Sequence, residues 1–309
     1  MTSLIEQAAL RLAQLKSAGI EVPAPMAAAR VEAASTVAET PLRTQVHDAV
    51  QSRRVEIDLH ALTEMGMLTP SNERSRTADQ FRVIKRPLIG NAVGKGSARV
   101  ANGNLIMVTS ALSGEGKSFT SLNLAMSIAA ELDHTVMLVD ADVARPSILR
   151  MLNLPPGPGL LDVLEGRADI AGTLLKTNVD KLTILPSGTP VPRATELLAS
   201  EAMRDLLHEM ATRYPDRIII FDSPPLLLTT ESRVLATHMG QIVVVVHAGR
   251  TLNSDLQHAL STIEACPVRM MVLNKATGSV QGAYGQGYGY GYGYGYGYGY
   301  GSEPTKQAA

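Results

Sequence analysis

The chain has 309 residues, of which 45% are hydrophobic and 18% charged, and its formal net charge is −1. This composition suffices for the buried core of one or two domains, and the near-neutral charge excludes a general affinity for nucleic acid or anionic membranes. Cys266 is the only cysteine, which excludes an intramolecular disulfide and fits a reducing compartment. We find no signal-peptide pattern and no apolar run of membrane-spanning length, so we expect a cytoplasmic protein.

The first 57 residues are expected to contribute little to a core. Residues 1–20 are predicted to form an N-terminal helix that begins with a capping box between Ser3 and Glu6. Residues 21–57 are rich in Ala and Pro and lack any periodicity. This composition indicates a flexible linker.

A helical extension is predicted for residues 58–99. It contains a short helix at 58–67 and a second helix that begins at Thr77. Pro87 is expected to bend or end the second helix, because proline lacks the backbone N–H that a helix interior needs.

Residues 100–280 have the pattern of a single α/β domain. Short runs of Val, Ile and Leu alternate with helix-length segments, which indicates a doubly wound, mostly parallel sheet covered on both faces. Ligands of such sheets bind at the carboxyl ends of the strands. The predicted strands are 105–108, 136–139, 182–185, 217–221, 242–246 and 268–273, and the predicted helices are 117–132, 195–214 and 253–265.

A phosphate-binding loop is predicted between the first strand and the first helix of this domain. Residues 111–118 read Ala-Leu-Ser-Gly-Glu-Gly-Lys-Ser, which is the P-loop spacing with Ala in place of the first Gly. Backbone N–H groups would bind phosphate oxygens, Lys117 would reach the β- and γ-phosphates, and Ser118 would ligate Mg²⁺. The flanking strand and helix argue against a chance glycine-rich turn. The predicted contacts to ATP are Ser113, Gly114, Glu115, Gly116, Lys117, Ser118 and Phe119.

Aspartates stand directly after two of the predicted strands. Asp140 and Asp142 follow the strand at 136–139, and Asp222 follows the strand at 217–221. A single Asp in this position is often only a helix N-cap. Beside a phosphate loop, Ser118, Asp142 and Asp222 can serve Mg²⁺, whose shell in proteins includes one or two carboxylates. Either Asp140 or Asp142 can then accept the proton of an attacking hydroxyl.

The C-terminal segment 281–309 differs from the rest of the chain. Gly and Tyr alternate through most of it, and eight tyrosines occur between Tyr284 and Tyr300. A Gly at every second position predicts a disordered tail. Considered alone, such a tail is also typical of a segment that drives self-association without any modification.

These motifs resemble those of the bacterial tyrosine autokinases of capsule and exopolysaccharide export. Residues 110–118 match the family's phosphate loop, Ser-x-x-Pro-Gly-Glu-Gly-Lys-Ser, except at Ser113. Residues 138–146 match its motif apolar run–Asp-x-Asp-x-x-x-Pro with Arg145 in place, and residues 218–225 match apolar run–Asp-x-Pro-Pro. The resemblance extends from about residue 58 to the end of the tail, and one stretch before the domain is similar to the exosortase-associated branch.

The resemblance implies a P-loop fold, related to septum-placing and partition ATPases, with protein tyrosine kinase activity. Family members form rings in which one protomer's tail enters the next protomer's site, using an E-x-x-R-x-x-R helix. Its nearest match here is Asp79, Arg82 and Lys85, where Asp and Lys replace Glu and Arg. A solvated basic face is the alternative. The implied phosphorylation sites are Tyr284, Tyr288, Tyr290, Tyr292, Tyr294, Tyr296, Tyr298 and Tyr300.

The resemblance also implies partners and further site residues. A separate membrane polysaccharide co-polymerase would recruit the kinase to the inner face of the plasma membrane, and a tyrosine phosphatase would reverse its action. Asn274 would read the adenine edge, although an Asn that closes a strand is also a common turn residue. The implied catalytic residues are Lys117, Asp140, Asp142 and Arg145.

Two other functions compete with the kinase. Positioning and partition ATPases carry a second lysine five residues before the loop lysine, and Leu112 occupies that position here. Their iron–sulfur relatives need pairs of cysteines, which Cys266 alone does not supply. The other alternative is a nucleotide-sensing scaffold without kinase activity, whose tail mediates assembly.

Overall fold

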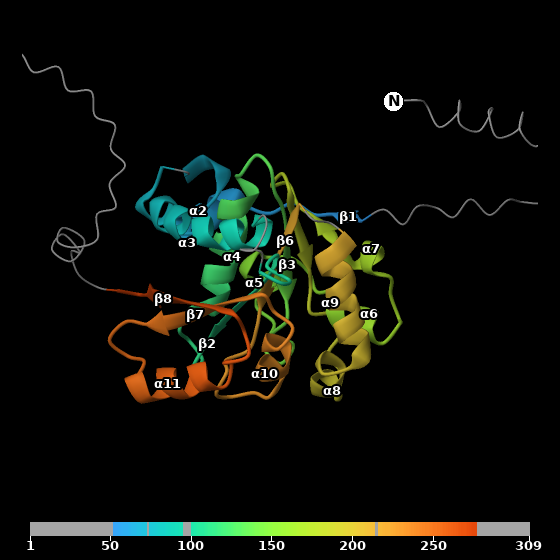
Figure 1. The fold of residues 1–309 in the computed structure, drawn as a ribbon. Coiled ribbons are helices and arrows are strands. Elements are labelled where there is room, and N and C mark those ends of the chain that lie inside the picture. Colours follow the sequence, from blue (N-terminus) through green and yellow to red (C-terminus); the bar gives the residue numbers. More distant parts are fainter. Residues whose placement is uncertain (1–51, 73, 95–99, 214–215, 277–309) are drawn as a thin grey trace, which may run out of the picture. The chain divides into compact units, whose positions relative to one another are not determined.

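The computed structural model describes residues 52–72, 74–94, 100–213 and 216–276, which form an eight-stranded sheet covered by helices (Figure 1). The strand order is β1-β4-β5-β3-β6-β2-β7-β8, and only β4 and β5 pair antiparallel. The strands are β1 (Arg53–Arg54), β2 (Leu105–Ser110), β3 (Thr135–Asp140), β4 (Leu175–Lys176), β5 (Leu182–Leu185), β6 (Arg217–Asp222), β7 (Gln241–His247) and β8 (Val268–Asn274). The helices are α2 (Leu59–Glu64), the 3-10 helix η1 (Pro70–Asn72), α3 (Arg76–Val93), α4 (Lys117–Ala129), α5 (Ile148–Met151), α6 (Leu160–Leu164), α7 (Ile170–Thr173), α8 (Ala194–Leu198), α9 (Glu201–Arg213), α10 (Glu231–Ala236) and α11 (Asn253–Ser261).

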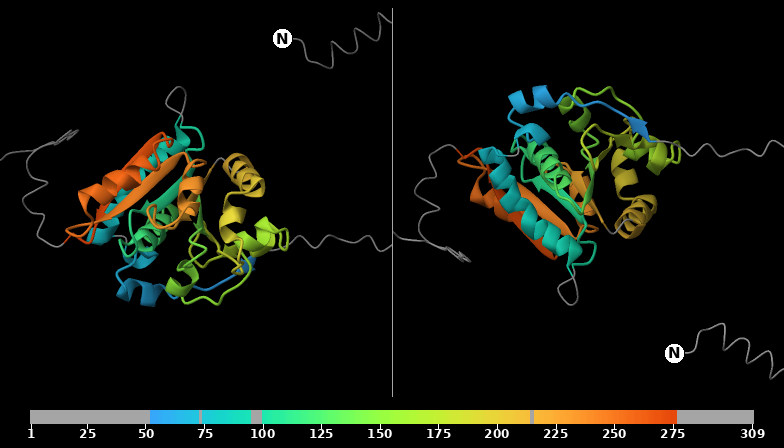
Figure 2. Two further views of the ribbon diagram at one scale, coloured as in Figure 1. Left: turned by 90° about the horizontal axis from the view of Figure 1, so that it is seen from below. Right: turned by 90° about the horizontal axis from the view of Figure 1, so that it is seen from above.

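Helices lie on both sides of the sheet (Figure 2). A layer of buried hydrophobic side chains separates the sheet from the helices on each side. Alternate residues of β2 show the division, because Ile106 and Val108 pack into the layer under α3 and α4, whereas Leu105 and Met107 pack under α9, α10 and α11. All six residues of β2 are buried. A strand buried on both faces needs a continuous apolar sequence, which explains why these strands were recognisable without alternation.

The predicted doubly wound fold is confirmed, and all six predicted strands are present within two residues of their expected bounds. Three of them extend to the polar residue that was expected to follow, so that Asp140, Asp222 and Asn274 each end a strand. The two-residue strands β1 and β4 were not predicted. They are too short to carry a periodic pattern.

Helix α3 begins one residue before the predicted start and does not end at Pro87, the second of the two outcomes expected for this proline. It begins at Arg76, and Ser75 rather than Thr77 caps it, with the Ala78 N–H donating to Ser75 Oγ at 3.1 Å. It also continues past Pro87, which does not end it. The carbonyl that loses its partner belongs to Val83, four residues earlier, and Val83 is 74% exposed, so water can replace the bond. Leu88, fully buried, holds the following turn against the sheet.

The predicted helix at 195–214 is two helices, α8 and α9. Ser200 separates them, and its Oγ accepts a hydrogen bond from the Met203 N–H at 3.2 Å, which caps the start of α9. The side-chain hydroxyl thus offers the backbone an alternative to a continuous helix. The sequence pattern alone did not reveal this break, because the apolar spacing continues across it.

Residues 52–57, which we expected to belong to the linker, are instead part of the fold. Ser52 Oγ donates to the Ala171 carbonyl at 3.1 Å, and the Ile57 N–H donates to Asn178 Oδ1 at 2.9 Å. Val55 and Ile57 are buried in the core between these contacts. The predicted N-terminal helix, the rest of the linker and the tyrosine-rich tail lie outside the described residues.

Within the part of the chain that the structure describes, no helix combines the length and the apolar character needed to cross a bilayer.

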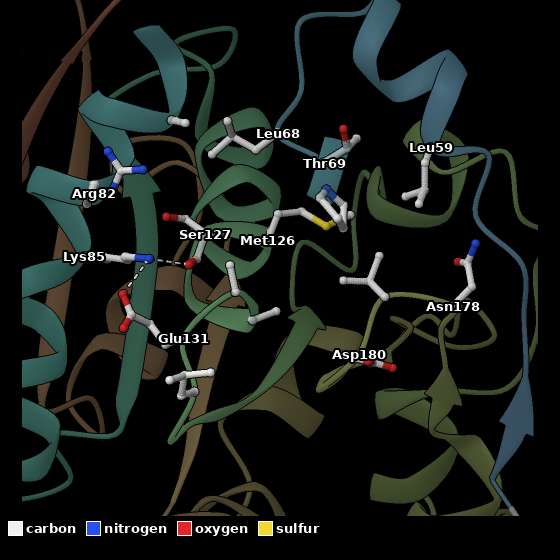
Figure 3. A pocket seen from close by; sticks show the side chains of 16 residues that line it. Leu59, Leu68, Thr69, Arg82, Lys85, Met126, Ser127, Glu131, Asn178 and Asp180 are labelled. Atoms are coloured by element: carbon white, nitrogen blue, oxygen red, sulfur yellow. Dashed lines mark hydrogen bonds and ion pairs between the residues drawn. The ribbon is translucent and has the colours of Figure 1, made fainter. Parts of the chain in front are cut away.

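Lys85 ties α3 to the end of α4 and is only 6% exposed. Its ammonium group donates to the Ser127 carbonyl at 2.5 Å and pairs with Glu131 Oε1 at 2.7 Å (Figure 3). The hydrogen bond from Lys85 lowers the pKa of the Glu131 carboxyl, against the opposing effect of burial. Both residues line a cavity of about 580 Å³ between α2, α3, α4 and the segment at 178–180.

We expect Glu131→Gln to reduce the free energy of unfolding by about 2 kcal/mol at pH 7, because it leaves the buried Lys85 charge without its partner. The lowered pKa means that this stabilisation is present above the ordinary carboxyl value of 4.5 and is lost as the pH falls through the folded-state value. Urea unfolding at pH 7 and pH 3 measures both effects. Glu201→Gln is the matched control, since Glu201 pairs with Arg204 on the surface. This substitution should lower the free energy of unfolding by less than about 0.5 kcal/mol. Equal losses in the two variants at pH 7 would contradict the assignment.

Candidate nucleotide and phosphoryl-transfer site

The site lies at the carboxyl ends of β2, β3 and β6, which are neighbours in the middle of the sheet. The phosphate loop follows β2 and leads into α4, while Asp140 and Asp222 end β3 and β6 and are register partners. Parallel pairing therefore brings the three predicted motifs together at the carboxyl ends of the strands. This is where doubly wound sheets bind their ligands. Residues more than one hundred positions apart in the sequence meet there.

The phosphate loop depends on two glycines with left-handed backbone. Gly114 has φ of +83° and Gly116 has φ of +100°, a region that other residues rarely adopt. Gly116 also packs tightly, since a Cβ atom at this position would come within 2.1 Å of Asn274 Nδ2. Lys117 and Ser118 then begin α4, so that the backbone N–H groups at its start face the end of the loop.

The Glu115 side chain points into the protein and braces the loop. It is 3% exposed, and its carboxylate accepts hydrogen bonds from the Leu112 N–H at 2.9 Å and from the Thr251 hydroxyl. The same hydroxyl accepts a bond from the His247 N–H at 3.0 Å, which links the loop to the end of β7. Any contact of Glu115 with a phosphate is therefore left to its backbone. No motif or spacing rule pairs Glu115 with Thr251, which lies 136 residues later in the chain.

Lys117 and Asp142 form the central ion pair of the site. Lys117 Nζ lies 2.6 Å from Asp142 Oδ2, and the Asp142 side chain is 5% exposed. Arg145 is exposed, and its backbone N–H, rather than its guanidinium group, contacts Asp142, donating to Oδ1 at 3.2 Å. The pair brings together a loop lysine, which can bind phosphate oxygens, and a carboxylate, which can serve Mg²⁺ or accept a proton.

Asp140 is buried with a carboxylate that is only half satisfied. Its Oδ2 accepts the N–H groups of Ser147 and Ile148 at 3.0 and 2.9 Å, while its Oδ1 is buried without a hydrogen-bond partner. Burial, followed by repulsion from Asp222, raises the pKa of Asp140 to about 7. Such a carboxyl exchanges a proton readily near neutral pH.

Asp222 is completely buried at the end of β6. Burial raises the pKa of Asp222, and the opposing influences are the Lys117 charge and hydrogen bonds from Ser118 and Ser121. Ser121 Oγ donates to Asp222 Oδ1 at 3.0 Å. Ser121 was not among the predicted site residues, although its position one helical turn after Lys117 puts it on the same face of α4.

The donor set fits Mg²⁺ only in combination with phosphate oxygens. Among the residues described, no group of three or more His, Cys, Asp or Glu side chains is arranged to hold a metal by itself. The unpartnered Asp140 Oδ1 and the mutual repulsion of Asp140 and Asp222 nevertheless mark a place where added positive charge is favourable. Mg²⁺ in nucleotide sites is typically held by one or two carboxylates together with phosphates.

Asn274 and Lys275 close over the phosphate loop from the end of β8. Asn274 Nδ2 donates to the Glu115 carbonyl at 2.9 Å, and its Oδ1 accepts the Lys275 N–H at 2.9 Å. Lys275 Nζ donates to the Gly114 carbonyl at 2.8 Å. Asn274 thus lies beside the loop, and its contact with the adenine edge stays a prediction.

The predicted interface residues do not share one exposed face. Asp79 and Arg82 form an ion pair on the surface of α3, whereas Lys85 is buried against α4 as described above. Lys85 therefore does not belong to a solvated basic face, which was the alternative interpretation, and the part of the three residues in an interface stays a prediction. Its long side chain reaches the carbonyl at the end of α4 instead of solvent. The eight tail tyrosines lie outside the described residues.

The comparisons with known proteins agree with this geometry. A family model for ParA, described as NUBPL iron-transfer P-loop NTPase, matches residues 102–226. The kinase domain of Escherichia coli tyrosine kinase ETK superposes with a TM-score of 0.53 at 26% identity, covering 62% of this chain and 73% of that domain. The fold and the phosphate loop thus define a P-loop NTPase of the ParA type.

The sequence relatives narrow this class. Tyrosine-protein kinase YwqD of Bacillus subtilis (strain 168) is 28% identical over 224 residues, which cover 72% of this chain and 91% of the relative. Tyrosine-protein kinase CpsD of Streptococcus agalactiae is 32% identical over 187 residues, 59% of this chain and 80% of the relative. Other matching kinases are longer, and the chain spans a quarter of their length. The chain belongs to the family of bacterial tyrosine-protein kinases.

We expect Gly116→Ala to abolish the binding of Mg·ATP, because the added methyl group both strains a backbone at φ +100° and overlaps Asn274 Nδ2. Gly114→Ala is the matched control. It carries similar backbone strain at φ +83°, but its methyl group would meet no atom within 4 Å. Titration of a fluorescent ATP analogue should show at least about a tenfold larger loss of affinity for Gly116→Ala, in line with a backbone that must approach another group closely. Equal losses would show that strain alone decides.

Proposed function

We propose that this chain is an ATP-dependent protein tyrosine kinase that phosphorylates the tyrosine cluster of its own tail, between protomers, and so regulates exopolysaccharide polymerisation and export. The proposal rests on the ion pair between Lys117 Nζ and Asp142 Oδ2, 2.6 Å apart, together with the Asp140 carboxylate, whose Oδ1 has no hydrogen-bond partner. A site of this kind offers both a phosphate ligand and a proton acceptor. Membership of the tyrosine-protein kinases supports tyrosine as the acceptor.

The chemistry assigns a role to each group. The tyrosine oxygen attacks the γ-phosphorus of ATP, its proton passes to a carboxylate, and the bond from the γ-phosphorus to the bridging oxygen breaks to release ADP. Mg²⁺ bound to the phosphates would neutralise the charge that develops on them, with Ser118, Asp142 and Asp222 as its protein-side ligands. Lys117 exchanges its contact with Asp142 for the β- and γ-phosphates.

Two aspartates are candidates for the proton acceptor. Asp140 has a pKa raised to about 7 and one free carboxylate oxygen, which suits a general base at neutral pH. Asp142 lies next to Lys117 and would act if Asp140 served only to shape the site. The role of Arg145 as a further catalytic group rests on the exposure of its side chain at the same edge.

The length of the tail supports its role as the substrate. About twenty Gly-rich residues span roughly 25 Å as a coil and at most about 70 Å when extended, which is enough to reach a neighbouring site. Glycines between the tyrosines leave each ring and hydroxyl accessible. The proposed assembly would use α3 with Asp79 and Arg82, and a separate membrane co-polymerase and a tyrosine phosphatase would complete the cycle at the inner face of the plasma membrane.

Hydrolysis without transfer is the main competing function. Leu112 stands where positioning ATPases carry their second lysine, and this loop residue packs against the hydrophobic core. A hydrophobic side chain in this position cannot stabilise phosphate charge across a dimer. This observation favours the kinase over the ATPase.

Incubation with γ-labelled ATP and Mg²⁺, followed by peptide mapping, should place label on the tail between Tyr284 and Tyr300. Lys117→Ala should lower the labelling by at least about a hundredfold, since a charge-stabilising contact to the transferred group is lost. Lys176→Ala is the control, since Lys176 is an exposed residue of β4 that is far from the loop in the sequence, and it should leave the labelling unchanged. Turnover of ATP with an unlabelled tail would support the ATPase, and binding of ATP without turnover would support the scaffold.

The single variants Asp140→Asn and Asp142→Asn identify the proton acceptor, because loss of that carboxylate should cause the larger drop in tail labelling.

Phosphorylation should also change the assembly. Modifying all eight tyrosines adds about −12 to −16 charges to one short segment, and this repulsion is expected to drive tails away from neighbouring protomers. Light scattering should therefore give a smaller mass for the phosphorylated protein than for the phosphatase-treated protein at equal concentration. Identical masses would contradict the proposed effect of phosphorylation on assembly, and they would leave the proposed kinase activity standing.

A further inference from the structure

Strand β8 forms one margin of the sheet, and among the described strands it pairs only with β7 (Figure 1). The Ala248 N–H donates to the Asn274 carbonyl at 2.9 Å, so the backbone groups of Asn274 face β7. Backbone groups alternate in direction along a strand. Arg269, Met271 and Leu273 therefore direct their N–H and C=O groups to the open edge, where no described strand pairs with them.

The same three residues lie on a face of β8 that the helices do not cover. Met271 pairs in register with Val244 of β7, which is fully buried, yet Met271 is 57% exposed and Leu273 is 64% exposed. Their neighbours Met270 and Val272 instead pack against the core under α3 and α4. An edge strand with unpaired backbone groups and exposed apolar side chains is a template for one more strand.

We propose that the Gly/Tyr tail of the same chain docks on this edge as a ninth strand, antiparallel to β8. The tail follows the strand closely in the sequence, since β8 ends at Asn274 and the tail begins at residue 281. Lys275 has φ of +57°, the left-handed conformation that hairpin turns use, and its Nζ anchors the exit of the chain at the Gly114 carbonyl. Residues 275–283 are long enough to reverse the chain before the first tail tyrosine.

The alternation of the tail fits this edge chemically. With a period of two, an extended Gly/Tyr repeat places every tyrosine on one face and every glycine on the other. The register that sets tyrosines opposite Met271 and Leu273 packs aromatic rings on exposed apolar side chains, a favourable cross-strand pairing. In this register the outward N–H and C=O groups of β8 bond to the tyrosine backbone.

The repeat also makes docking degenerate. A shift by one Gly-Tyr unit restores the same contacts, so many registers are equivalent, as expected for a repetitive strand. Seven residues of β8 pair with about as many tail residues, so about three or four tyrosines dock at a time and the others stay available. Phosphate groups about 7 Å apart along one face would repel each other, so the unphosphorylated tail is the form that docks. This goes beyond the proposed function and needs no nucleotide.

Hydrogen exchange of the full-length, phosphatase-treated protein without nucleotide tests the docking. We expect the amides of Arg269, Met271 and Leu273 to exchange at least about tenfold more slowly than in a full-length variant with all eight tail tyrosines changed to serine. The protection should not depend on protein concentration, because the tail docks on its own chain. Equal exchange in the two proteins would overturn the proposal, and protection lost on dilution would assign the edge to the tail of a second copy.

A second pair of variants tests the side-chain contacts. The double substitution Met271→Lys and Leu273→Lys, at exposed positions, should remove the protection of tail amides by a similar factor while leaving the melting temperature nearly unchanged. Leu132→Lys, at a position 86% exposed after α4, is the matched control and should keep the protection. Tail amides that exchange equally in both variants would contradict docking on β8. Labelling of the tail with ATP is a separate measurement, so loss of docking and loss of kinase activity are distinguishable.

Discussion

The site depends on the parallel register that aligns Asp140 with Asp222 at the ends of β3 and β6. Parallel pairing forces the two carboxylates to the same edge of the sheet, and burial there disfavours their charged forms. Lys117 and hydrogen bonds from neighbouring backbone and serine groups offset only part of this cost. The fold thus keeps two buried carboxylates close together at an unfavourable electrostatic free energy. Bound Mg²⁺ with its nucleotide is suited to lower this free energy, and the other groups of the site surround the two carboxylates.

The shape of the phosphate loop is stabilised by contacts with residues outside it. Glu115 turns its carboxylate inward to Leu112 and Thr251, and Asn274 fills the space beside Gly116. The loop is therefore shaped before any phosphate arrives, which reduces the reorganisation that binding requires. The same contacts connect the loop to β7 and β8, so its shape depends on strands that carry no motif of their own.

The fold could be predicted because its strands are continuous apolar runs followed by polar residues, as in Ile218–Phe221 before Asp222. The phosphate loop could be predicted because glycine and lysine occur at a fixed spacing between a strand and a helix. Other features had no local signal. In the sequence Lys85 lies among charged residues of one helix face, but its partner Glu131 follows a different helix, α4. The contact of Ser121 with Asp222 and that of Glu115 with Thr251 likewise join segments far apart in sequence, and only the tertiary structure brings them together.

The hydrogen bond from Lys275 to the Gly114 carbonyl ties the end of the described chain to the phosphate loop, a few residues before the tail in the sequence. If the tail is the substrate, as proposed, its covalent attachment presents the tyrosines at an effective concentration set by the length of the tether, in the millimolar range for short flexible linkers. A catalytic site supplied in this way does not need tight recognition of its acceptor. Selection can then act on the number of residues between Asn274 and the first tyrosine, whereas the sequence around each tyrosine is free to be as simple as a Gly-Tyr repeat.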